Sequence, residues 1–181
     1  MQVLRHILQE LTDYLEISLM YMDNLNIVGF RATIDSIDET LKQMNNLKKD
    51  GEIIQLLNAD SIVSKNHIIH GVNQAFLAFS RDENLANDIS VEIVLRCSAQ
   101  RQISKAFDIL GLKEGNINLC VIFINCDYTE ELSSVFSQDD EVFTADKKRL
   151  QKVYSISDEE LRTMSLENII IDRITKLTVN Y

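Results

Sequence analysis

Two histidines three residues apart, His67 and His70, are the side chains in this 181-residue chain whose types and spacing most suggest chemistry. On a helix this spacing brings both imidazoles to one side, where they could meet one metal ion. A metal also needs a third ligand, and by sequence only Asp60 and Asp82 are candidates. A polar groove, or histidines with satisfied hydrogen bonds, is therefore favoured over a metal site, and we expect no cofactor.

The candidate nucleophile is Cys97, which follows Arg96, because a neighbouring cation lowers the pKa of a thiol. No histidine or acid adjoins it to form a nucleophile–base pair, and a cysteine in an apolar run is usually part of a core. A phosphate-binding glycine loop is also absent, since the closest glycines are Gly111 and Gly115 and no Gly-Lys-Ser/Thr follows. We predict a protein without catalytic residues, although an enzyme using His67 or Cys97 remains an alternative.

Charge and cysteine content limit the possible partners and compartments. The formal net charge of -10 argues against nucleic-acid binding over the whole surface. Residues 58–113, however, carry six basic and six acidic side chains, so nucleic-acid contact is least unfavourable there. Three cysteines without a CxxC pair indicate reduced thiols, and we expect a cytoplasmic protein without a signal peptide or membrane span.

The two histidines belong to a predicted helix over residues 64–80. One side of this helix is polar or small, and its apolar residues centre about 120° away on a helical wheel. From the residues alone, the first side is either an ordinary solvated face or a binding groove. The polar side of the helix holds His67, His70, Gly71 and Gln74, and the apolar side holds Ile68, Val72, Ala75 and Phe79.

The rest of the chain predicts a single α/β (α+β) domain in which helices pack on a small mixed, largely antiparallel sheet. The run at 118–125 is apolar on both faces, as expected for a central strand covered on both sides. Residues 90–98 fit a helix or a strand, and we favour a helix. The other predicted strands are 25–33 and 52–58, and the other helices are 2–18, one from Asp35 to Gly51, one from Ser98 or Gln100 to Gly111, 128–137, 145–154, 157–164 and 165–177.

The predicted final helix, 165–177, has apolar residues on more than one side, since Ile169, Ile170 and Ile171 point in three directions. Such a helix is either inserted in its own core or shared with a partner. The residues alone do not separate these two possibilities.

Two motifs, with an apolar strand after them, carry a family resemblance. NADSIVSKNHIIHGVNQAF (58–76) and SVEIVLRCSAQRQISKAFDILGL (90–112) resemble the kinase-binding subunit of the KEOPS tRNA-modification complex, most closely its archaeal members. The resemblance covers about 125 residues, from Glu52 to Leu177, and supports a helix at 90–98. Gly71 stands where alanine is more usual. We divide the chain into an N-terminal helical extension (1–24), which departs from the family pattern, and a domain over 25–181.

The resemblance implies a non-catalytic protein. KEOPS installs threonylcarbamoyl on the adenosine beside the anticodon of tRNAs that read ANN codons, and the chemistry belongs to another subunit. The resembling family binds the N-lobe of a small RIO-like kinase/ATPase subunit, and archaeal members recruit tRNA through its single-stranded 3′ CCA end. The alternative from a different class is a regulatory α/β domain that binds a small molecule in a groove beside His67.

These expectations assign two sets of residues. Single-stranded RNA ends are bound by edge hydrogen bonds, stacking and cations on the backbone, so the polar helix face and nearby basic residues form the candidate RNA site. Its members are Lys65, His67, His70, Gln74, Arg96, Arg101 and Lys105. The expected contact with the kinase is on the final helix, at Leu166, Ile170, Ile174 and Leu177.

Overall fold

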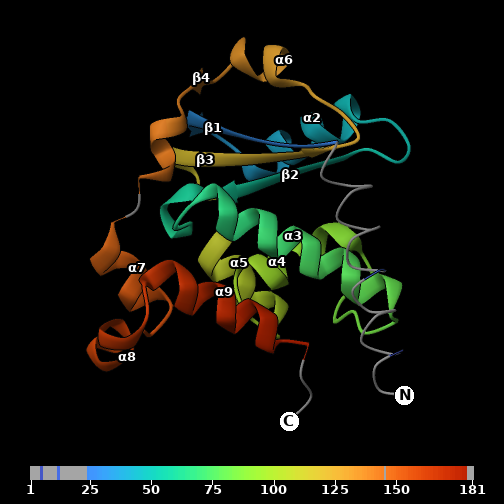
Figure 1. Cartoon of the computed structure of the whole chain (residues 1–181). Coiled ribbons are helices and arrows are strands. Elements are labelled where there is room, and N and C mark those ends of the chain that lie inside the picture. Colours follow the sequence, from blue (N-terminus) through green and yellow to red (C-terminus); the bar gives the residue numbers. More distant parts are fainter. Residues whose placement is uncertain (1–4, 6–11, 13–23, 145, 179–181) are drawn as a thin grey trace.

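The computed structural model describes residues 24–144 and 146–178, together with Arg5 and Thr12. Apart from Arg5, Thr12 and Asn24, the helix predicted over 2–18 and the extension proposed for 1–24 lie outside the described residues. The sheet has the order β2-β3-β1-β4, and its three pairings are all antiparallel. Its strands are β1 (Leu25–Ile34), β2 (Ile53–Asn58), β3 (Gly115–Ile124) and β4 (Ser137–Gln138). The predicted α+β architecture is confirmed (Figure 1).

The central strand β3 is buried on both faces, as its uninterrupted apolar run predicted. Cys120 and Ile122 belong to a core cluster with α3 (Lys65–Ser80) and α4 (Ile89–Cys97). Leu119 and Val121 point to the opposite face, in a cluster that includes Met44 of α2 (Ile37–Leu47) and Leu132 of α6 (Thr129–Ser133). The alternation of side chains along a strand therefore gives the sheet two cores, one on each face.

A third core cluster lies away from the sheet, where α9 (Leu166–Lys176) packs against α3 (Figure 1). It also uses α7 (Lys147–Val153), while α8 (Asp158–Thr163) completes this C-terminal group. The remaining elements are the 3₁₀ turns η1 (Ala59–Ser61) and η2 (Asp140–Phe143) and the helix α5 (Ile103–Leu110). Among the described residues, no helix has the length and hydropathy needed to cross a bilayer.

Local signals place most helix starts correctly. The ambiguous segment at 90–98 is the helix α4, as favoured, and the side chain of Asp88 caps its start. The helix predicted over 157–164 is α8, and Ser157 and Glu160 form a capping box at its start. The helix predicted over 128–137 was too long, because α6 ends at Ser133 and residues 137–138 pair with β1 as β4. A short edge strand of two residues leaves no periodic pattern from which it could be predicted.

Candidate functional site

His67 is a buried structural residue, in contrast to the accessible RNA contact that the sequence suggested. Its side chain is fully buried. The backbone N–H of Val63 donates to Nδ1 at 3.3 Å, so the proton is on Nε2, which donates to the Cys97 carbonyl at 2.6 Å. Burial lowers the pKa of His67 to about 4, which keeps the ring neutral near pH 7. His67 therefore joins the start of α3 to the end of α4.

The predicted polar side of α3 is mostly an internal contact between helices. Gly71 and Gln74 are buried together with His67, and only His70 is partly accessible. A Cβ at Gly71 would lie 2.4 Å from Sγ of Cys97. The glycine thus allows the close approach of α4, not of a ligand. The groove expected beside His67, which a small molecule was to occupy in the alternative interpretation, is filled by protein.

Arg96 is also unsuited to holding a phosphate, which corrects its assignment to the RNA site. Its side chain is fully buried, and Nε donates to Oε1 of Glu92 at 2.7 Å. The other carboxylate oxygen of Glu92 accepts from the backbone N–H groups of Leu85 and Ala86, both at 2.8 Å. This pair ties the 81–88 loop to α4, and an arginine used in this way cannot also reach solvent.

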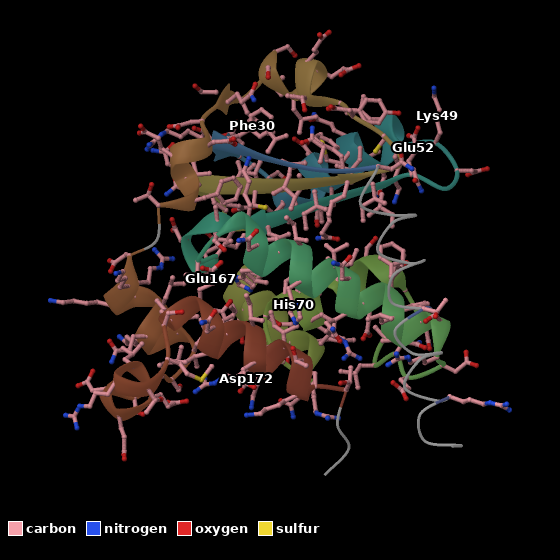
Figure 2. The ribbon with its side chains drawn as sticks, viewed as in Figure 1. Phe30, Lys49, Glu52, His70, Glu167 and Asp172 are labelled. Atoms are coloured by element: carbon pink, nitrogen blue, oxygen red, sulfur yellow. The ribbon has the colours of Figure 1, made fainter. Side chains whose placement is uncertain are left out.

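His70 and Arg101, from distant parts of the sequence, meet at the C-terminal end of α9. His70 Nε2 lies 2.8 Å from Oγ1 of Thr175, and Arg101 donates to the Leu177 carbonyl at 2.9 Å. Figure 2 shows His70 on α3 facing α9. Lys105 is exposed on α5, four residues after Arg101. We call His70, Arg101 and Lys105 the basic surface: they are the members of the predicted RNA set that stay accessible apart from Lys65, and the first two both contact the end of α9.

Lys65, the seventh predicted RNA residue, lies at the opposite end of α3 from Ser80, near η2. Its Nζ is 2.7 Å from Oδ2 of Asp140 and 5.3 Å from the centre of the Phe143 ring. The lysine is partly exposed, so the ion pair is weak, but it compensates the charge of Lys65 locally. The structure therefore groups Lys65 with an acidic segment and not with His70.

The four residues predicted to contact the kinase are mainly part of the third core. Ile170 and Ile174 are completely buried, and Leu166 is nearly so, among side chains that include Leu150 and Tyr154. Of the four predicted residues, only Leu177, which follows the end of α9, keeps partial exposure. The interpretation of the final helix as an inserted core helix is the correct one, because α7 and α3 cover its apolar sides.

A different apolar surface is open on α5. Ile103 and Phe107 lie four residues apart, so they share one side of the helix, and they are 50% and 42% exposed. Ala106 and Leu110 on the same helix are buried. The spacing of Ile103, Phe107 and Leu110 places them on one apolar side of the helix, but spacing does not show that only part of that side is covered.

The thiol chemistry considered for Cys97 has no structural support. Cys97 is fully buried, and burial raises the pKa of its thiol far above the ordinary range. Within residues 24–144 and 146–178, no three histidine, cysteine or acidic side chains are placed to hold a metal ion. The buried His67 and Cys97 are thus packing residues that share one helix–helix contact.

Comparison with known proteins identifies the family. Residues 32–176 match the family described as kinase binding protein CGI-121. The chain is also 36% identical over 103 residues to "Regulatory protein Cgi121" of the archaeon Methanocaldococcus jannaschii. That alignment covers 53% of this chain and 65% of the relative, slightly less than two thirds of its length. Because the family match spans most of the chain, this protein belongs to the CGI-121 kinase-binding protein family.

Proposed function

We propose that the protein is a non-catalytic KEOPS subunit that binds the complex's small RIO-like kinase/ATPase and recruits tRNA through the 3′ CCA end. Membership of a kinase-binding family supports the first role, and the relative's description as a regulatory protein is consistent with it. The observation that carries the RNA role is the meeting of His70 and Arg101 at the end of α9.

The basic surface has the properties that a single-stranded RNA end requires. Arg101 binds the same end of α9 as the half-buried imidazole of His70, and Lys105 is exposed four residues after Arg101, so this set offers cations for phosphates and a ring for a base. Arg101 already donates to the Leu177 carbonyl, which orients its planar guanidinium. The net charge of -10 implies that binding depends on this local surface and weakens steeply with salt.

Fluorescence anisotropy tests the RNA role with full-length tRNA and the same tRNA lacking its 3′ CCA, at low and moderate salt. We expect loss of the CCA end to weaken binding strongly, and Arg101→Glu to do the same. Arg162→Glu is the matched control, because Arg162 is an exposed arginine on α8 and its reversal changes the net charge equally. If Arg101→Glu and Arg162→Glu weakened tRNA binding equally, the change in net charge would explain the effect. The basic surface would then no longer be the proposed RNA site.

For the kinase contact we propose the exposed side of α5. Association between proteins is driven by apolar surface in the centre of the interface, and Ile103 with Phe107 provides such surface outside the core. In this proposal, the exposed side of α5 replaces the buried residues of α9 as the kinase contact. Leu177, which is partly exposed, can still lie at the edge of that interface.

A pull-down with the purified kinase subunit tests this assignment. Ile103→Asp with Phe107→Asp should abolish capture while the thermal unfolding transition stays cooperative. Leu41→Asp on α2 is the control, since Leu41 is 43% exposed, as Phe107 nearly is. Loss of capture with Leu41→Asp and not with the α5 variant would move the kinase contact to the other side of the molecule.

A further inference from the structure

Among residues 24–144 and 146–178, pairing covers only part of the outer edge of β1. Strand β4 pairs with β1 at Phe30 and Arg31, and the backbone N–H of Asp139 donates to the Gly29 carbonyl at 2.9 Å. The N–H of Gly29 donates to Oδ1 of Asp140 at the same distance. A Cβ at Gly29 would lie 2.5 Å from Val142 and 2.6 Å from the Asp139 carbonyl oxygen, so the glycine lets η2 close this part of the edge.

Toward the start of β1, no described residue pairs with the outer edge. Backbone groups of alternate residues in a strand point to the same side, so Ile27, two residues before Gly29, presents its N–H and C=O to this edge. Within the described part of the chain, β1 pairs only with β3 and with the two residues of β4. Proteins usually block such an edge with proline, charge or a bulge, and residues 25–28 (Leu-Asn-Ile-Val) contain none of these.

A groove follows this part of β1. It has a volume of about 520 Å³ and is lined by Asn26, Ile27 and Val28 of β1. One wall is α6 with the residues before it, and the other is η2, which pack on opposite faces of the sheet through Leu132 and Val142. In Figure 1, α6 and β4 lie above β1 at the top of the view. At about 3.3 Å per residue, an extended segment of about four residues would lie beside 25–28.

The charge of the groove indicates what kind of segment fits. Four acidic residues line it against one lysine, and that lysine, Lys65, already pairs with Asp140. Glu130 and Glu131 are exposed in the first turn of α6. They belong to the wall on the α2 side of the sheet, so an added strand needs lysine or arginine at the positions that point to this side. Its alternate positions point toward Lys65 and favour apolar or small side chains.

We propose that the groove binds a lysine- or arginine-bearing extended segment of a partner protein, which adds to β1 as a strand beside Ile27. Main-chain hydrogen bonds to Ile27 supply a sequence-independent part of the affinity, and Glu130 and Glu131 select basic side chains. The surface is separate from the basic surface at the end of α9 and from the apolar side of α5, so this interaction does not depend on the proposed function.

The probe for the test is a fluorescein-labelled, end-capped peptide, Lys-Val-Lys-Val-Lys-Val, titrated into the full chain. Two versions carry backbone N-methyl groups, at the odd or at the even positions. In a strand only one of these sets faces β1, so one version should bind about tenfold more weakly and the other nearly as the parent does. Amide hydrogen exchange at Ile27 should slow when the parent peptide binds.

Two double variants separate strand addition from attraction by net charge. Glu130→Lys with Glu131→Lys should weaken peptide binding about tenfold or more at low salt. Asp158→Lys with Glu159→Lys makes the same charge change in the first turn of α8 and should leave binding within about twofold. Absence of peptide binding, equal binding of all methylated versions, unchanged exchange at Ile27, or equal effects of the two variants would each overturn the proposal.

Discussion

Gly71 of α3 and Cys97 at the end of α4 approach so closely that a Cβ on the glycine would lie 2.4 Å from the cysteine sulfur and 3.0 Å from its Cα. Both residues are buried. The polar side of α3, for which a binding groove was one of two possibilities, is thus in direct contact with α4. The contact decides which polar residues of α3 are available to a ligand.

Gly71→Ala should destabilise the protein, although alanine is the better helix former. The added methyl group overpacks the contact and costs about 1–3 kcal/mol, against a gain of about 1 kcal/mol in helix propensity. Chemical denaturation measures the difference. The double variant Gly71→Ala with Cys97→Ala should recover part of the loss, because the sulfur is then absent. Gly71→Ala as stable as the parent would mean that α3 and α4 separate without cost.

His67 should make stability fall with acid. Its folded pKa of about 4 lies below the ordinary value of 6.5, so between these pH values the unfolded chain binds more protons than the folded chain. Stability is therefore complete above about pH 6.5 and decreases as the pH falls, by about 2 kcal/mol at pH 5 from this residue alone. Denaturation at pH 7 and pH 5 should show a smaller difference in His67→Asn. An NMR titration in which His67 protonates near pH 6.5 would contradict the buried, neutral ring.

Arg96→Met should unfold the protein at lower temperature and leave RNA affinity unchanged wherever the variant is folded. Removing the guanidinium leaves the Glu92 carboxylate buried without its cation, which costs about 3–5 kcal/mol. Arg101→Glu is the contrasting variant, since Arg101 is exposed and its change should affect RNA binding more than stability. If Arg96→Met stayed stable and lost RNA binding, the sequence-based assignment of Arg96 to phosphate would be restored.

Ile174→Ala should be far more costly than Ile171→Ala on the same helix. Ile174 is completely buried in the third core, so the cavity costs about 2–5 kcal/mol, whereas Ile171 is partly exposed. Thermal melts measure both variants, and kinase capture should survive in each folded protein. A stable Ile174→Ala that fails to capture the kinase would return the partner contact to α9.

Deleting residues 165–181 should abolish the cooperative melt, because it removes half of this core.

Local sequence patterns were sufficient for most elements. Periodic apolar residues, caps such as Ser64 and Ser157, and the two-sided run in β3 identify helices and strands, because these signals depend on neighbours along the chain. The motifs at 58–76 and 90–112 indicated the family, which the match over 32–176 confirms. One missed signal was available: Glu92 and Arg96 lie four residues apart within an apolar helix, a spacing typical of an ion pair.

The sequence by itself determined that this is one α+β domain of the kinase-binding family, with a helix whose two histidines lie on one side. Only the tertiary structure decided that His67 is covered by α4 while His70 reaches the end of α9, and that Ile174 is buried while Ile103 is exposed. The physical reason is that periodicity shows which residues share a side of a helix. Whether that side meets water, another helix or a partner depends on segments distant in the chain.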